Sequence, residues 1–211
     1  GYPYDVGLFN ESEIGIAYIN NPGLDERLYI ERHVGINGSW KKVSQFENVF
    51  PPLDSPENEA LLWTSQRAKV LPGLIEDLIL TENYLFVLSE SRLFRTSSTA
   101  NSMPWELLVE LPILDNESIS LSLGNDGHIY MLAQRLRKIF VVHPEEGLIG
   151  EFGPAESRLA LVSPSSIAAS PKDGFIWIQA AGWGIAKYNK DFQFLGRWEF
   201  GPLTLRGVTI H

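Results

Sequence analysis

Short apolar stretches alternate with polar turns along the whole chain. Stretches of five or six residues, such as Ile14–Ile19 and Tyr84–Leu88, are separated by clusters of Gly, Pro, Asn, Asp and Ser. This pattern predicts strands, because a strand is a short apolar or alternating run, whereas a helix shows a longer pattern with a period of 3.6 residues. No apolar run approaches the roughly 20 residues that a membrane-spanning helix needs.

The first half of the chain repeats itself at a spacing of 65 residues. Arg27–Tyr29 aligns with Arg92–Phe94, and each segment reads as a strand followed by a polar turn. Without a gap, the same spacing pairs Trp40 with Trp105, Val43 with Leu108 and Phe46 with Leu111. Both copies therefore predict a hairpin whose second strand opens with Trp.

The second half repeats at a different spacing. Asp126–Tyr130 recurs 47 residues later as Asp173–Trp177, and Glu151–Pro154 recurs 48 residues later as Glu199–Pro202. An apolar stretch precedes each Asp-Gly turn, and two further strand patterns follow it. The chain thus contains four units of four short strands each, at about 5–46, 74–111, 117–153 and 165–201.

Four-stranded units of about 40–50 residues are typical of β-propeller blades. A single blade cannot cover its own two faces, so neighbouring blades stack around an axis. The sequence predicts one all-β domain over residues 1–211, a β-propeller of about four to five blades or a fragment of a larger propeller. An ordinary β-sandwich, which shares the same strand spacing, is the alternative.

An insertion at residues 47–73 separates the first two units by more residues than most connections contain. Residues 50–59 form a polar, proline-stiffened loop, and residues 60–64 read as a short helix or an extra strand. The insertion is either a degenerate fifth blade or a binding element carried by a rigid scaffold. In the second case, Glu57, Glu59 and Trp63 are the predicted contact residues.

The second half resembles the NHL family of propeller repeats. The resemblance rests on Ser166–Trp177, with its Asp-Gly turn, and on the strand patterns Gly184–Asn189 and Phe194–Trp198. The first half is similar to the BNR-type repeats of sialidases and photosystem-assembly propellers through Asn37–Trp40, although it lacks the fuller Asp-box of that motif. These resemblances imply a propeller and leave the activity open.

Composition narrows the classes of function. Apolar residues make up 44% of the chain and charged residues 20%, which is globular composition. The net charge of −9 argues against nucleic-acid binding. The absence of cysteine excludes disulfides, thiolate metal sites and cysteine nucleophiles. Three Asn-x-Ser glycosylation acceptors, at Asn10, Asn37 and Asn116, favour an extracytoplasmic or lumenal location.

No catalytic motif stands out. There is no Gly-x-Ser-x-Gly elbow, and the four histidines lack the spacing of a metal site. The sequence therefore predicts no catalytic residue, no metal ligand and no cofactor. The alternative is a calcium-dependent propeller hydrolase, for which Glu76, Asp77 and Asn125 would supply the oxygen ligands.

Trp183 lies between glycines in Ala181–Gly184, a setting that predicts an exposed turn. An exposed Trp there would stack on a sugar or on a protein partner, whereas packing between blades is the structural alternative. The favoured hypothesis is a non-catalytic scaffold or assembly subunit that binds a protein partner. A lactonase or glycosidase with a site at the central axis and a carbohydrate-binding lectin are the alternatives.

Overall fold

The computed structural model describes residues 2–10, 13–20, 26–36, 39–50, 63–64, 67–68, 75–89, 91–97, 105–112, 117–153, 164–170, 172–180 and 184–199. All regular secondary structure in these ranges is β-strand, as predicted, and no helix there is long and apolar enough to cross a membrane. The chain divides into two compact units, Gly1–Leu111 and Pro112–His211, which are described separately. The single domain over residues 1–211 stays a prediction.

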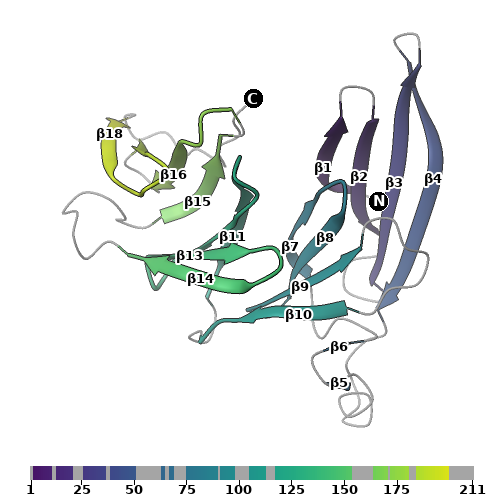
Figure 1. Ribbon diagram of the computed structural model, residues 1–211, viewed down its shortest axis with the longest axis horizontal. Helices are drawn as coiled ribbons and strands as arrows, with labels where there is room; N and C mark the ends of the chain where they lie inside the picture. Colours follow the sequence, from purple (N-terminus) through teal and green to yellow (C-terminus); the bar gives the residue numbers. More distant parts are fainter. Residues whose placement is uncertain are drawn as a thin grey trace. The chain divides into compact units, whose positions relative to one another are not determined.

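The first unit contains two antiparallel sheets (Figure 1). The first sheet consists of β1 (Tyr2–Asn10), β2 (Glu13–Asn20), β3 (Glu26–Ile36) and β4 (Ser39–Phe50), paired in that order. The second sheet is built around β7 (Ile75–Leu80), β8 (Tyr84–Ser89), β9 (Arg92–Ser97) and β10 (Trp105–Glu110). Strand β7 of the second sheet lies against β1 and β2 of the first.

Two short strands from the insertion extend the second sheet. They are β5 (Trp63–Thr64) and β6 (Arg67–Ala68), and β6 pairs with β10 through Ala68 and Trp105. Trp63 and Thr64 are therefore in a strand, not a helix. In the described part of the insertion, the strands add to the second sheet and form no separate fifth one.

The second unit also contains two antiparallel sheets (Figure 1). The third sheet consists of β11 (Ile119–Leu123), β12 (Ile129–Ala133), β13 (Lys138–His143) and β14 (Gly147–Phe152). The fourth consists of β15 (Pro164–Ala169), β16 (Ile176–Ala180), β17 (Gly184–Tyr188) and β18 (Phe194–Glu199). Each of the four repeat units found in the sequence thus contains one four-stranded meander.

An apolar core fills the space between the third and fourth sheets. The third sheet contributes Tyr130, Leu132, Ile139 and Val141; the fourth contributes Ile167, Ala169, Ile176, Ile178, Ala186 and Tyr188. These residues alternate along their strands, so each sheet turns one face to the other. Fully burying an aliphatic or aromatic side chain of this size stabilises the fold by about 1.5–3 kcal/mol. Strands β11 and β15 lie side by side at this interface.

Every meander has a β-bulge in its last strand. One residue there has no partner in the register of the preceding strand, and in all four sheets it is aliphatic: Val43, Leu108, Ile149 and Leu195. A bulge adds local twist, and at a sheet edge it hinders pairing with another strand. Val43 and Leu108 are separated by the 65-residue spacing of the sequence repeat, so the repeat extends to backbone detail.

Candidate functional site

Most of the predicted contact residues fall outside the described part of the chain. Glu57, Glu59 and Trp183 lie outside the described residues. Trp63 is described through its backbone alone, which pairs with Ala68 in β5–β6. The role of these four residues as contact residues therefore stays a prediction.

The calcium ligands of the alternative hydrolase hypothesis occupy two different units. Glu76 is exposed and Asp77 half-buried in β7, where Asp77 Oδ1 accepts a hydrogen bond from the Leu78 amide at 2.9 Å. Asn125 is exposed in the β11–β12 turn of the second unit, and a Cβ at Gly174 would lie 3.0 Å from its Oδ1. Among the described residues, no group of three or more His, Asp or Glu side chains could hold a metal ion. The absence of a cofactor stays a prediction, and calcium binding stays the alternative to it.

Comparing equivalent positions of the third and fourth sheets shows which polar contacts the turns themselves require. Asp126 and Asp173 occupy equivalent positions in the Asp-Gly turns. Asp126 Oδ1 accepts a hydrogen bond from the His128 amide at 3.1 Å, and Asp173 Oδ1 accepts one from the Phe175 amide at 3.2 Å. Because both sheets share this bond, it belongs to the turn and not to a specific site.

His143 and Asn189 form a second equivalent pair. His143 Nδ1 accepts hydrogen bonds from the backbone amides of Glu145 and Glu146, both at 3.2 Å. Asn189 Oδ1 accepts them from the backbone amides of Asp191 and Gln193, at 3.0 and 2.8 Å. His143 thus caps the β13–β14 turn in the way that Asn189 caps the equivalent β17–β18 turn.

The third sheet adds a polar cluster at its turns. His128 Nδ1 lies 2.9 Å from Asp126 Oδ2, and the Tyr130 hydroxyl donates to the same oxygen at 3.2 Å. The ring of His128 meets the ring of His143 edge-on, with centroids 5.6 Å apart. We call Asp126, His128, Tyr130 and His143 the histidine cluster.

Burial and hydrogen bonding set the charge of this cluster. Partial burial alone would raise the pKa of Asp126, but hydrogen bonds from the His128 amide and ring, the charge of His128 and the Tyr130 hydroxyl together lower it. Burial and the adjacent Asp126 carboxylate raise the pKa of Tyr130. At neutral pH the cluster therefore holds an ionised Asp126 and a protonated Tyr130.

In the fourth sheet, Phe175 and Trp177 occupy the positions that His128 and Tyr130 have in the third sheet, and Lys187 lies next to both rings. Lys187 Nζ lies 3.5 Å from the centroid of the Phe175 ring and 4.8 Å from that of Trp177. The rings of Trp177 and Trp198 have centroids 5.2 Å apart at an interplanar angle of 35°. Half-buried Ile185 pairs with Trp198 across β17–β18. We call Phe175, Trp177, Ile185, Lys187 and Trp198 the Trp177–Trp198 surface.

This surface occupies a face that is covered in the neighbouring sheet. By register, Trp177, Ile185 and Lys187 correspond to Tyr130, Ile139 and Val141, which are buried against the fourth sheet. Trp198 corresponds to Phe152, which also packs on that core. In the fourth sheet, by contrast, Trp177, Ile185 and Lys187 are half-buried and Trp198 is 47% exposed. The face of the fourth sheet that corresponds to the buried face of the third sheet is thus partly open to solvent.

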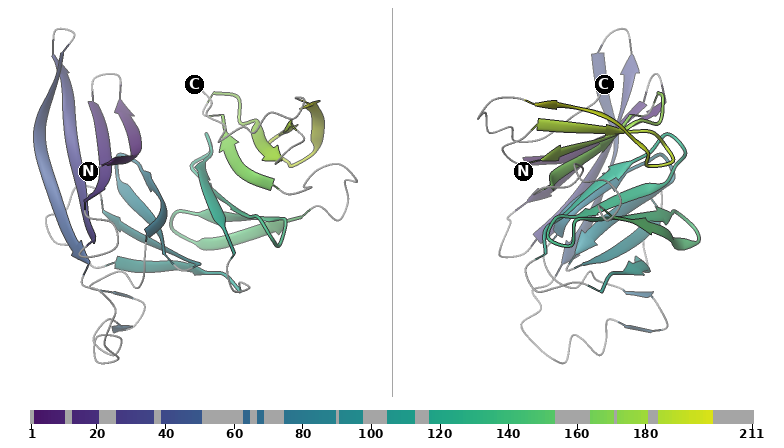
Figure 2. Two further views of the ribbon diagram at one scale, coloured as in Figure 1. Left: turned by 180° about the vertical axis from the view of Figure 1, so that it is seen from behind. Right: turned by 90° about the vertical axis from the view of Figure 1, so that its left-hand side faces the viewer.

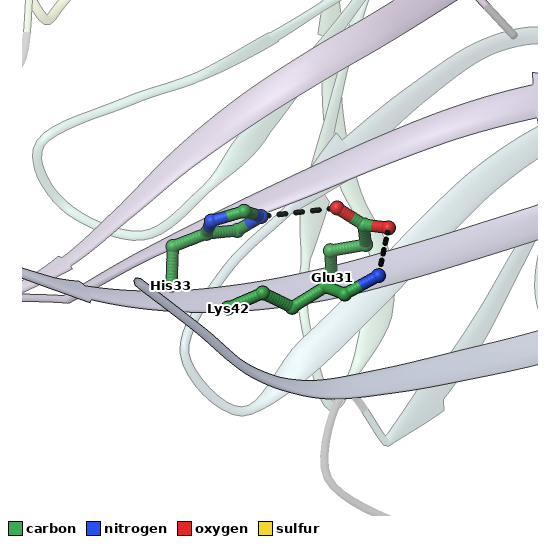
Figure 3. Close-up of polar contacts among 3 residues, drawn as sticks. All are labelled: Glu31, His33 and Lys42. Atoms are coloured by element: carbon green, nitrogen blue, oxygen red, sulfur yellow. Dashed lines mark hydrogen bonds and ion pairs between the residues drawn. The ribbon is translucent and has the colours of Figure 1, made fainter. Parts of the chain in front are cut away.

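A second exposed Trp lies on the β3–β4 hairpin, which extends past the β1–β2 hairpin (Figures 1 and 2). Trp40 is 51% exposed and pairs with Gly35, which offers it no side chain. Further along the same face, Glu31 accepts hydrogen bonds from Lys42 Nζ and from His33 Nε2, both at 3.0 Å (Figure 3). Glu31 and His33 both belong to β3, whereas Lys42 belongs to β4, so the Glu31–Lys42 ion pair joins neighbouring strands, an arrangement that stabilises a strand pair.

No protein-family model matches the chain, and no curated protein matches it in sequence. Among solved structures, the chain is similar to YCF48 bound to D1 peptide, with 12% identity and a TM-score of 0.52 over 93% of this chain and 67% of that one. It is also similar to a structural genomics protein of unknown function from Bacteroides thetaiotaomicron (13% identity, TM-score 0.55, 91% and 46% covered). A catalytically inactive virginiamycin B lyase from Staphylococcus aureus with quinupristin is a third such structure (13% identity, TM-score 0.50, 94% and 70% covered).

These solved structures are β-propellers, and at such identities the likeness shows the fold alone. Together with the four antiparallel meanders, it confirms the prediction of an all-β propeller or a fragment of one. The chain spans less than half the length of the Bacteroides protein.

Sequence reasoning missed the residues of the Trp177–Trp198 surface. It used Trp177 and Trp198 as repeat markers and did not consider their exposure. A usable signal was present, because aligning the two repeats at 46 residues places Lys187 on Val141 and Trp198 on Phe152. A charge in place of a core valine indicates that this face is not buried in the same way.

Proposed function

We propose that the chain is a non-catalytic propeller module that binds another protein through the Trp177–Trp198 surface. The observation that carries the proposal is the exposure of Trp198, 47%, on a face whose counterpart in the third sheet is buried. Partly exposed apolar surface that matches a packing face is typical of an interaction site.

The chemistry of the surface suits a protein partner. Trp is among the residues that contribute most to the free energy of binding at protein interfaces, because its large ring loses little conformational entropy on binding. Lys187 lies over two of the rings and adds a positive charge to a chain whose net charge is −9. We therefore expect the bound segment to present an apolar side chain next to an acidic one.

The likeness to YCF48, a protein solved with a bound peptide, supports the proposal at the level of the fold. The NHL-like character of the second half and the BNR-like character of the first half belong to the same proposal, since both families are propellers. Glu57, Glu59, Trp63 and Trp183 remain candidate contact residues. Trp183 immediately precedes Gly184, whose strand partner Glu199 follows Trp198.

A random dodecapeptide library displayed on phage tests the proposal. Peptides enriched on the wild-type protein should bind the Trp198→Ala variant at least tenfold more weakly, measured by calorimetry. Trp40→Ala is the matched control, because Trp40 has a similar exposure of 51% on another sheet. Affinity for Trp40→Ala should equal that of the wild type.

Two results would contradict this function. One is equal peptide affinity of the wild type and Trp198→Ala, which would place binding elsewhere. The other is saturable binding of glycans on an array that Trp198→Ala abolishes, because paired Trp rings also stack on sugars. That result would assign the surface to a lectin.

A further inference from the structure

The β3–β4 hairpin of the first sheet projects past the strand beside it (Figures 1 and 2). The pairing of β2 with β3 ends at Val34, whereas β3 and β4 continue to pair through Gly35 with Trp40 and through Ile36 with Ser39. These two rows extend the ribbon by about 7 Å beyond the end of β2. We call Gly35, Ile36, Ser39 and Trp40 the β3–β4 tip.

Both faces of the tip present a large apolar side chain to solvent. Residues that pair directly share a face of the ribbon and successive residues alternate, so Trp40 lies on one face with Gly35 and Ile36 lies on the other with Ser39. Ile36 and Trp40 are each 51% exposed. The tip thus exposes apolar surface on two opposite sides, which one flat partner surface could not cover.

Basic residues follow the uncharged tip. Residues 32–46 contain Arg32, Lys41 and Lys42 and no Asp or Glu, in a chain whose net charge is −9. Lys42 pairs with Glu31 at 3.0 Å, whereas no described side chain pairs with Lys41. On β2, Glu13 occupies the row of Val34 and Lys41, and no acidic residue lies beyond that row. The tip therefore combines an apolar end with cationic side chains directly behind it.

We propose that the β3–β4 tip inserts into the interface of a bilayer that contains anionic phospholipids. Ile36 and Trp40 enter the boundary between headgroups and acyl chains, a position that Trp favours because its ring is amphipathic. Lys41 and Lys42 then lie among the lipid phosphates, which attract basic residues within about 10 Å of the surface at 0.1 M salt. The 7 Å extension of the ribbon agrees with the depth of about 5–10 Å that interfacial segments reach.

A fluid interface fits this tip better than a macromolecular partner does. Lipids surround an inserted ribbon from both sides, so they cover Ile36 and Trp40 together, whereas a protein groove or a nucleic acid that docks against one face leaves the other exposed. The tip shares no residue with the Trp177–Trp198 surface and does not depend on the function proposed for it.

Sedimentation with sucrose-loaded vesicles of phosphatidylcholine and phosphatidylserine tests the proposal. We expect the wild type to bind these vesicles, and Trp40→Ala and Ile36→Thr each to bind at least about fivefold more weakly, because each removes apolar surface from the interface. Trp198→Ala is the matched control, since Trp198 has a similar exposure of 47% on another sheet and should bind as the wild type does. Thermal melts should show wild-type transitions for both tip variants, whose replaced side chains are exposed.

Two further measurements separate insertion from adsorption. Lys41→Gln should weaken binding, and added salt should remove the difference from the wild type, whereas Lys190→Gln, at an exposed lysine of the β17–β18 turn, should have no effect. Lipids brominated on their acyl chains should quench part of the Trp fluorescence. This quenching should disappear in Trp40→Ala and persist in Trp198→Ala.

Several results would overturn the proposal. They are the absence of vesicle binding, equal binding to vesicles of phosphatidylcholine alone, and binding that Trp40→Ala leaves unchanged. A loss in only one of Trp40→Ala and Ile36→Thr would indicate a partner that covers a single face. Weaker binding of the selected peptides by Trp40→Ala would assign the tip to a protein partner instead. Because Trp198→Ala tests the other surface and leaves the tip intact, the two proposals fail independently.

Discussion

Ala169 donates its backbone N–H to Ser122 Oγ at 2.8 Å, and this hydrogen bond crosses from the fourth sheet to the third. Ser122 belongs to β11 and Ala169 to β15, the strands that lie side by side at the sheet interface. A second bond, from Gln134 Nε2 to the Ser165 carbonyl at 2.9 Å, crosses the same interface. Polar contacts thus supplement an apolar core in fixing how these two sheets pair.

Replacing Ser122 by Ala should destabilise the protein. The Ala169 amide is buried and would lose its acceptor, and a buried unsatisfied donor costs about 1–3 kcal/mol. Ser120→Ala is the control, since the Ser120 hydroxyl bonds to no described residue; its effect should stay within about 0.5 kcal/mol. Denaturant unfolding measures both, and equal effects of the two variants would contradict the role assigned to the Ser122 hydroxyl.

Gly184 should tolerate no side chain. Its φ of 133° lies in the region that favours glycine, and a Cβ there would overlap the Trp198 carbonyl group. Gly184→Ala should therefore destabilise the fold by about 1–3 kcal/mol or more, and it should disturb the Trp177–Trp198 surface. Gly196→Ala in the same sheet has open space around its Cβ and should be close to neutral. A thermal melt of each variant checks this, and an unchanged midpoint for Gly184→Ala would refute the close approach.

The Asp126 carboxylate should contribute stability that depends on pH. Its pKa in the folded protein lies below the ordinary value of 3.8, so the ionised form is favoured by folding. The contribution is complete above the unfolded pKa and is lost as the pH falls through the lowered folded value. Asp126→Asn should thus be less stable than the wild type at neutral pH, and the difference should shrink below about pH 4.

Denaturant midpoints of the wild type and Asp126→Asn between about pH 2.5 and 7 measure this difference. Tyr130→Phe serves as a partial control, because it removes one of the hydrogen bonds that lower the pKa of Asp126. It should narrow the pH range over which stability is lost. A difference between the wild type and Asp126→Asn that is constant over the whole range would show that the pKa of Asp126 is not lowered.

Deleting residues 51–59 tests the predicted role of the insertion. If Glu57 and Glu59 belong to a contact element, the deletion should weaken partner binding while leaving the melting curve nearly unchanged, since insertions on rigid scaffolds carry binding function. The peptides selected on the wild type provide the measurement. Unaltered affinity would remove the insertion from the binding surface.

Much of the fold was predictable because the same strand pattern recurs in each repeat unit of the sequence. Spacings of 65 and 47 residues located four meanders, and the aliphatic bulge residues Val43 and Leu108 already aligned in the sequence. The candidate sites were less predictable. Trp63 and Trp183 drew attention through their loops, whereas Trp177 and Trp198 lie within strands, where an aromatic residue ordinarily indicates a core.

The sequence by itself determined the class of fold, because alternation, turn residues and repetition are local properties that one chain carries in order. Exposure was decided by the tertiary structure, and Lys187 in place of Val141 was the signal of it in the sequence. Tyr130 and Trp177 occupy equivalent strand positions, yet one is buried between two sheets while the other is half-buried beside an exposed Trp198. The tertiary structure also decided the contact between the rings of His128 and His143. These residues are 15 positions apart in the chain, and they meet because two turns of one antiparallel sheet lie at the same end.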